Sequence, residues 1–141
     1  MSFRIRKATA TDQPRIHAIR MGVSENVLSD PSKVTDEEVA WYREQAIFLV
    51  AEVDGAVAGF TCANHQTGLV WALFIDKAHE GRGLGRALLD AALDRLSAAG
   101  HAQAWLTTGA GTRAERFYLR HGWQDMGHSL DGNVVFVKPL D

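Results

Sequence analysis

The residues best suited to chemistry in this chain lie in a glycine-rich loop that joins an apolar run to an amphipathic segment. Residues 69–75 form the apolar run, and every second residue from Gly81 to Gly85 is glycine. Arg82 and Arg86 add positive charge at the same place. The N–H groups in the first turn of a helix have no intrahelical partner and attract anions, and glycine lets the main chain approach a phosphate closely. The pattern predicts a diphosphate-binding loop.

Two other phosphate-binding patterns do not fit this loop. The dinucleotide fingerprint G-x-G-x-x-G needs glycine at position 86, where the chain has Arg86. The P-loop needs Gly-Lys followed by Ser or Thr, and that tripeptide does not occur in the sequence. A strand-to-helix turn that binds no ligand is the structural alternative, and the loop alone does not decide against it.

Two stretches of the chain resemble the signatures of the GNAT superfamily of N-acyltransferases. Residues 80–85 are similar to its acyl-CoA signature, Arg/Gln-x-x-Gly-x-Gly/Ala. Residues 114–123 resemble its second signature, Ala-x-x-x-Tyr-x-x-x-Gly-Phe, with Trp123 in the last position. The resemblance is close over roughly residues 47–128. Glu80 departs from the first signature because it brings a negative charge near the phosphates, which Lys77 could offset.

The resemblance implies that acetyl-CoA is the co-substrate and that this loop holds its diphosphate. The strand before the loop should splay from the next parallel strand, so that its free edge pairs with the pantetheine arm. Main-chain groups are expected to bind the co-substrate at two places, the strand end and the loop: Phe74, Ile75, Arg82, Gly83, Leu84, Gly85 and Arg86.

The resemblance also implies direct transfer of an acetyl group to a primary amine of a small molecule or peptide, with Tyr118 as the general acid that protonates the departing thiolate. His65 and Glu52 are weighed as general bases, and neither is assigned. The acceptor and the acyl chain stay open. The alternative is a non-catalytic module that binds or senses acyl-CoA, which thiol release from acetyl-CoA would separate from an enzyme.

Composition restricts the remaining function classes. The 141 residues have a net charge of −2, which gives no general attraction to nucleic acid or membranes. No apolar run is long enough to span a bilayer, and the one cysteine, Cys62, suits a reducing cytoplasm. The six histidines show no metal-ligand spacing, so no metal site is expected. We expect one cytoplasmic domain over residues 1–141.

The periodicity of apolar residues predicts an α/β (α+β) fold. It should hold a mixed, mostly antiparallel sheet of six or seven strands flanked by about four helices, in the order β-α-α-β-β-β-α-β-α-β-β. Strands are expected at residues 3–7, 48–53, 57–64, 69–75, 102–108, 123–129 and 134–138, and helices at about 9–24, 35–45, 84–100 and 112–122. Thr35–Glu38 and Thr112–Glu115 are capping boxes, and the terminal hairpin could pair across a homodimer.

Overall fold

The fold is built on one seven-stranded sheet. The computed structural model describes residues 2–22 and 35–140, so the helix end expected near residue 24 and the loop expected at 26–32 lie outside the described residues. The strands are β1 (Phe3–Lys7), β2 (Ile47–Val53), β3 (Ala56–Asn64), β4 (Leu69–Ile75), β5 (Gln103–Thr108), β6 (Gln124–His128) and β7 (Val134–Pro139). They lie in the order β1-β2-β3-β4-β5-β7-β6. Within the described chain, β4 and β5 are parallel and every other neighbouring pair is antiparallel.

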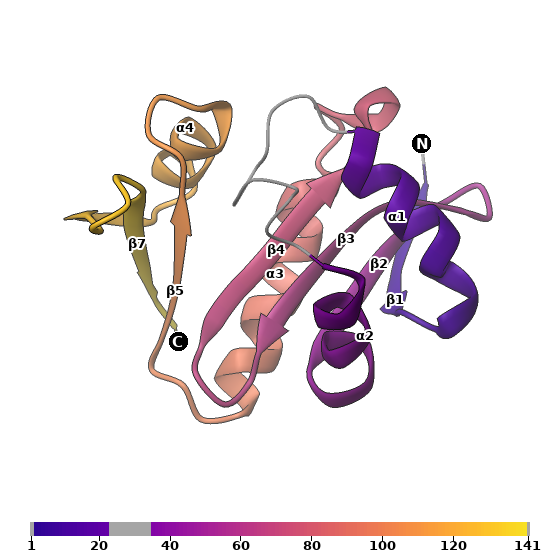
Figure 1. Ribbon diagram of the computed structural model, residues 1–141, viewed down its shortest axis with the longest axis horizontal. Helices are drawn as coiled ribbons and strands as arrows, with labels where there is room; N and C mark the ends of the chain where they lie inside the picture. The colour runs from indigo at the N-terminus through magenta and orange to yellow at the C-terminus, as the bar shows by residue number, and fades with distance from the viewer. Residues whose placement is uncertain (1, 23–34, 141) are drawn as a thin grey trace.

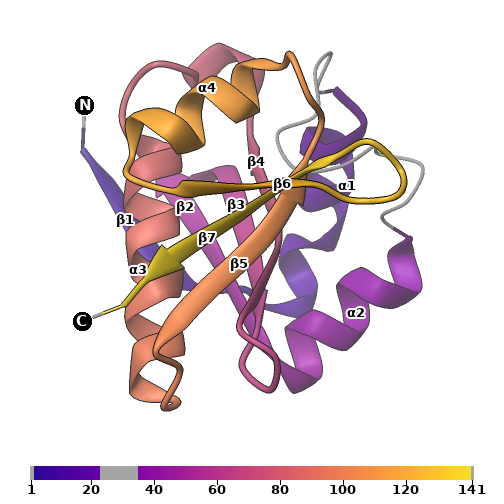
Figure 2. The same cartoon turned by 90° about the vertical axis from the view of Figure 1, so that its left-hand side faces the viewer.

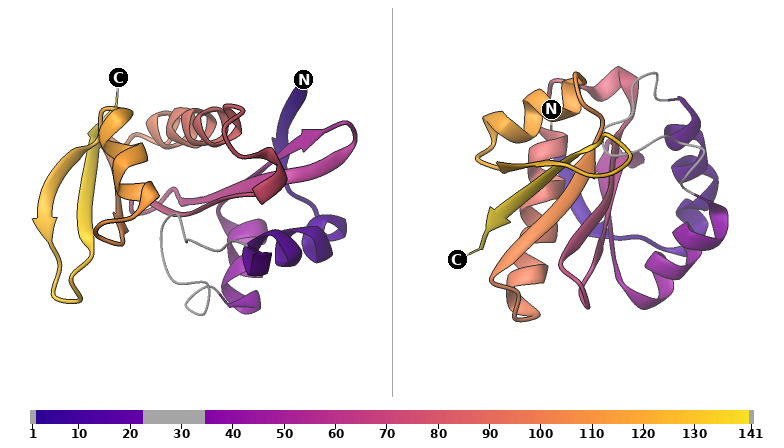
Figure 3. Two further views of the ribbon diagram at one scale, coloured as in Figure 1. Left: turned by 90° about the horizontal axis from the view of Figure 1, so that it is seen from above. Right: turned by 60° about the vertical axis from the view of Figure 1, so that its left-hand side comes forward.

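Helices cover both faces of this sheet. In the described chain they are α1 (Gln13–Gly22), α2 (Asp36–Gln45), α3 (Leu84–Ala98) and α4 (Arg113–Arg120). The view from above in Figure 3 shows α1 and α2 on one face and α3 on the other. Figure 2 shows α4 crossing near the upper end of α3. The predicted mixed, mostly antiparallel sheet with flanking helices is confirmed. Among the described helices, none has the length and apolarity needed to cross a membrane.

The centre of the sheet is buried on both faces. Residues 57–63 of β3 are all buried, as a strand covered on both sides requires. On α3, Leu84, Leu88, Ala92 and Leu96 recur at every fourth residue and are at most 1% exposed. This stripe packs α3 against the sheet and so fixes the position of its first turn.

A gap opens between β4 and β5. β4 pairs with β3 along its whole length, but with β5 only where Leu69 meets Trp105. On its other edge β5 pairs with β7 from Gln103 to Thr108, and Figure 1 shows β4 and β5 diverging. The register between β3 and β4 shifts around Trp71, which is an extra residue in β4. Such a bulge bends and twists its strand, and it lies where the two strands begin to part.

The start of α4 differs in one detail from the capping box predicted at Thr112–Glu115. Thr112 accepts a hydrogen bond from the N–H of Glu115, as expected for the N-cap residue. The Glu115 carboxylate, however, accepts from the N–H of Gly111 at 3.1 Å rather than returning to Thr112. The helix therefore starts where predicted, with half of the box formed. The box predicted at Thr35–Glu38 is complete.

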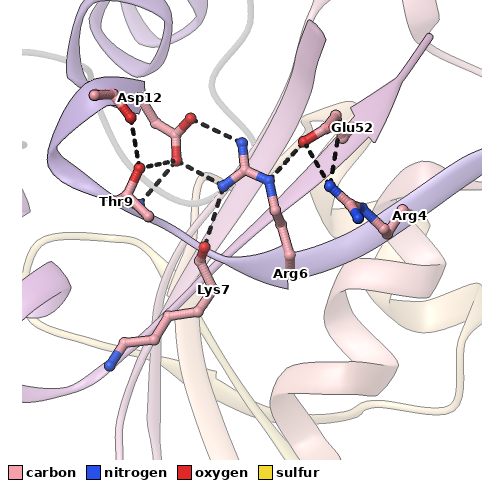
Figure 4. A network of polar contacts seen from close by, with 7 residues as sticks. Arg4, Arg6, Lys7, Thr9, Asp12 and Glu52 are labelled. Atoms are coloured by element: carbon pink, nitrogen blue, oxygen red, sulfur yellow. Dashed lines mark hydrogen bonds and ion pairs between the residues drawn. The ribbon is translucent and has the colours of Figure 1, made fainter. Parts of the chain in front are cut away.

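A cluster of ion pairs ties the N-terminal strand to the rest of the sheet (Figure 4). Two nitrogens of the Arg6 guanidinium donate to the two oxygens of Asp12, each at 2.9 Å. Its Nε donates to Glu52 of β2 at 2.6 Å. Asp12 is buried and also accepts from the N–H of Thr9 at 2.8 Å. The cluster thus joins β1 and β2 to the turn that leads into α1.

Replacing Arg6 with glutamine is expected to lower the melting temperature at neutral pH by roughly 5 °C. The hydrogen bonds from Arg6 hold the pKa of both carboxyls, Asp12 and Glu52, below their ordinary values. Their contribution to stability is therefore complete above about pH 5 and is lost as the pH falls through the lowered pKa values. Thermal unfolding between neutral and acid pH should show a shallower loss in the variant than in the parent.

Arg4→Gln is the matched control, because Arg4 is exposed and reaches only the Glu52 carboxylate, at 3.3 Å. It should keep most of the parent's acid sensitivity, because Arg4 does not act on Asp12 and the hydrogen bond from Arg6 is the largest cause of the lowered pKa of Glu52. An Arg6→Gln protein with the parent's full acid sensitivity would show that other groups determine it.

Candidate functional site

The first turn of α3 presents unpaired main-chain donors. Gly83 is the N-cap residue, with a φ of +86° that favours glycine, and it makes no side-chain capping bond. The first intrahelical bond runs from the N–H of Ala87 to the carbonyl of Gly83, at 3.1 Å. The N–H groups of Leu84, Gly85 and Arg86 precede that bond and have no intrahelical acceptor. Unpaired N–H groups at a helix start are the feature on which the sequence-based prediction of a diphosphate-binding loop depends.

A cavity of about 340 Å³ opens in front of these donors. It lies between the end of β4, the first turn of α3 and one side of α4. The residues that line it are Leu73, Ile75, His79, Glu80, Gly81, Gly83, Leu84, Gly85, Arg86, Arg113, Ala114, Phe117, Arg120 and His121. Five of the seven residues predicted to bind the co-substrate belong to this set, and Arg82 and Phe74 do not.

Gly85 keeps this cavity continuous. A Cβ at position 85 would lie 3.8 Å from Cγ1 of Ile75 and 3.8 Å from Cζ of Phe117. These are ordinary contact distances, so a single methyl group fits at position 85, beside the passage between β4 and α4. A longer side chain would close the passage between the α3 donors and the β4 edge.

The free edge of β4 exposes the main chain of Leu73 and Ile75. The carbonyl of Phe74 lies 3.0 Å from the Cβ position of Gly59 in β3, so it faces β3. Since main-chain groups alternate between the two edges of a strand, those of Leu73 and Ile75 face the gap that β5 leaves. The structure therefore brings Ile75 to the cavity and turns Phe74 away. The sequence analysis missed Leu73, because only the register against β3 shows which of the alternating main-chain groups face the gap.

The side chain of Tyr118 lies behind the cavity wall. It is fully buried, and its ring packs edge-on against Trp123 at 5.5 Å. Among the described residues, its hydroxyl has no hydrogen-bond partner. Burial raises the pKa of the phenol well above its ordinary value, so the proton stays on the oxygen. Tyr118 lies one helical turn from Ala114 and His121, which line the cavity, but Tyr118 itself does not line it. Within the described residues its O–H group is a hydrogen-bond donor without an acceptor.

Neither residue weighed as a general base reaches the cavity. Glu52 is held by Arg6 on the β1 side of the sheet. His65 lies in the turn before β4, at the opposite end of that strand from Ile75, and its carbonyl is bonded to the ring of His101. Within residues 2–22 and 35–140, no three His, Cys, Asp or Glu side chains form a group suited to a metal ion.

An ion pair bridges the mouth of the cavity. Glu80, in the turn before α3, accepts a hydrogen bond at 2.8 Å from Arg113, the first residue of α4. The negative charge that departs from the acyl-CoA signature is therefore paired with Arg113, a partner that the sequence analysis did not name. The pair connects the two elements between which a ligand would enter.

Replacing Glu80 with glutamine is expected to tighten CoA binding by about two- to threefold, because a negative charge is removed beside the phosphates. Isothermal titration at low and high salt would measure the effect, which should shrink as salt screens the charges. Glu44→Gln removes an exposed carboxylate from α2, on the opposite face, and is the control. Weaker binding by Glu80→Gln would mean that the ion pair itself organises the cavity.

Comparisons with known proteins indicate the same family as the two sequence signatures. The model of the acetyltransferase (GNAT) family matches residues 12–123. A mycothiol acetyltransferase of Clavibacter sepedonicus is 36% identical over 89 residues, a stretch that covers 61% of this chain and 29% of that protein. The chain thus spans less than a third of that relative's length.

Two solved structures share the fold. A GCN5-related N-acetyltransferase from Rhodopseudomonas palustris has a TM-score of 0.82 at 18% identity, covering 99% of this chain and 97% of the other. The PaiA N-acetyltransferase of Thermoplasma acidophilum, solved in complex with coenzyme A, has a TM-score of 0.80 at 16% identity and covers 99% of both chains.

Proposed function

The chain belongs to the GNAT family of acetyltransferases, and on that premise we propose that it transfers an acetyl group from acetyl-CoA to a primary amine. The observation that carries the proposal is a single cavity in which the first turn of α3 meets the free edge of β4. A ligand with a diphosphate and a long arm that carries amide groups fits that combination. Acetyl-CoA has both.

The cavity offers a binding group for each part of this ligand. The N–H groups of Leu84, Gly85 and Arg86 donate to the diphosphate, and the positive end of the α3 dipole favours its charge. The main chain of Leu73 and Ile75 pairs with the amide groups of the pantetheine arm, as the edge of a sheet pairs with an added strand. Because Arg82 and Phe74 do not line the cavity, they have no part in this proposal.

The transfer step needs a polarised carbonyl and a proton for the leaving sulfur. When bound, acetyl-CoA supplies an activated thioester that an unprotonated amine attacks directly: the bond from nitrogen to the carbonyl carbon forms, the bond from carbon to sulfur breaks, and the proton that the nitrogen loses goes to solvent. We assign the polarising hydrogen bond to the N–H of Ile75 and the proton donor to the hydroxyl of Tyr118. That hydroxyl has no partner within the described part of the chain, and burial keeps the proton on its oxygen by raising the pKa. Since Tyr118 does not line the cavity, α4 has to shift when the ligand binds.

A second candidate is a module that binds acyl-CoA without transferring the acyl group. The observation that favours it is the same burial of the Tyr118 hydroxyl behind the cavity wall. Both candidates use the same cavity and differ only in chemistry. A measurement of thiol release is therefore the test that separates them.

The experiment is a panel of small amines and peptides offered with acetyl-CoA, followed by detection of free thiol and of the acetylated product by mass spectrometry. We expect amine-dependent thiol release with a matching mass gain in at least one acceptor, under the reducing conditions of a cytoplasm. Binding of acetyl-CoA by calorimetry with no thiol release from any amine would favour the binding module.

A further inference from the structure

A second cavity adjoins the first beside α3. It has a volume of about 510 Å³ and lies between α3, the end of α4 and β7. Arg86, Arg120 and His121 line both cavities. The two cavities therefore meet at these three residues.

The second cavity is positively charged. Arg86, Arg120 and Lys138 line it, and Asp90 is its one carboxylate among the lining residues. Asp90 is 3.8 Å from Arg86 on the next turn of α3, and both side chains are mostly exposed. His121 is neutral near pH 7, because burial and these three cations lower its pKa. The formal charge of the lining is therefore +2, from three cations and one carboxylate.

Among these cations, Lys138 is held in position by a hydrogen bond to the main chain. It is half-buried on β7, and its Nζ donates at 2.6 Å to the carbonyl of His121, just after the end of α4. The ammonium has three donors, so two remain after this bond. An anion entering the cavity would meet a positive charge that is already held in place, which reduces the entropy lost on binding.

We propose that this second cavity binds the 3′-phosphate of coenzyme A and that Lys138 makes the protein select the phosphorylated form of the co-substrate. The inference rests on the proposed function and follows from the order of groups along coenzyme A. The pantetheine arm lies on one side of the diphosphate, and the ribose with its 3′-phosphate lies on the other. With the arm at β4 and the diphosphate at the start of α3, the ribose phosphate comes next, beyond Arg86.

The test compares the binding of CoA and of dephospho-CoA by isothermal titration. The parent should bind CoA about tenfold more tightly, since the 3′-phosphate adds a charge-assisted contact. Lys138→Met should remove most of this preference, because it weakens the binding of CoA and leaves the binding of dephospho-CoA unchanged. Lys7→Met deletes a lysine from β1, at the far edge of the sheet, and should keep the preference. Arg120→Gln, which leaves the bond between Lys138 and His121 in place, should reduce the preference in part.

Equal affinities of the parent for CoA and dephospho-CoA would overturn the inference and leave the proposed function standing. So would a Lys138→Met protein that loses affinity for both ligands to the same degree. A parent that binds neither ligand would overturn the inference and the proposed function together.

Discussion

Replacing Gly85 with leucine is expected to weaken the binding of acetyl-CoA by more than about a hundredfold, because the new side chain obstructs the passage that the ligand has to occupy. Its Cβ would already touch Ile75 and Phe117 at 3.8 Å, and the remaining carbon atoms would extend into the cavity. The fold should not suffer. Position 85 is in the first turn of α3, where leucine favours the helix over glycine by about 0.5–1 kcal/mol.

Gly85→Ala is the matched control for this experiment. Its single methyl group fits at ordinary contact distances, so binding should stay within a few-fold of the parent. Calorimetry measures both affinities, and thermal unfolding confirms that both variants fold. A Gly85→Leu protein that binds acetyl-CoA as tightly as the parent would show that the ligand does not pass between β4 and α4.

Replacing Tyr118 with phenylalanine is expected to lower kcat by about a hundredfold or more, because a positioned general acid contributes on that scale. The affinity for acetyl-CoA should change little, since the hydroxyl binds neither the diphosphate nor the pantetheine arm. Stability should rise by about 1 kcal/mol, because a buried hydroxyl without a partner is costly in the free protein. Steady-state kinetics, calorimetry and thermal unfolding measure the three quantities.

Tyr42→Phe is the comparison variant that distinguishes a catalytic role of the Tyr118 hydroxyl from a role in core packing. Tyr42 is also buried, but its hydroxyl is hydrogen-bonded to Asn64 and its ring stacks on Trp71 at 4.3 Å. Its loss should lower stability and leave kcat unchanged. If Tyr118→Phe keeps the parent's kcat, Tyr118 is a core residue and not a general acid.

The loop and the elements around it were predictable because their signals are local. The apolar run 69–75 became β4 with the same bounds, and Gly83 began α3 where the glycines indicated. The hairpin turns and the helix between β4 and β5 gave the strand directions. Such features depend on residues that are close together in the sequence, so a single sequence is enough to predict them.

The details that decide the chemistry depend on contacts between distant segments. The ion pair of Glu80 and Arg113 joins residues 33 positions apart. The main chain of Phe74 faces β3 and not the gap because of the register of β4 against β3. The sequence of β4 does not predict that register. Tyr118 matched a signature, but its burial results from packing against Trp123 and β7 residues such as Phe136. The second cavity likewise includes Lys138 because β7 brings this residue to the end of α4.

Hydrogen exchange at single-residue resolution, with and without saturating acetyl-CoA, tests the central claim most directly. The claim is that main-chain N–H groups at the start of α3 hold the diphosphate. The ligand should slow exchange at Leu84, Gly85 and Arg86 and at Ile75 on the free edge of β4, while the amides of α2 on the opposite face keep their rates. Unchanged exchange at these four residues under saturating ligand would contradict the proposed binding mode and the acetyltransferase assignment built on it.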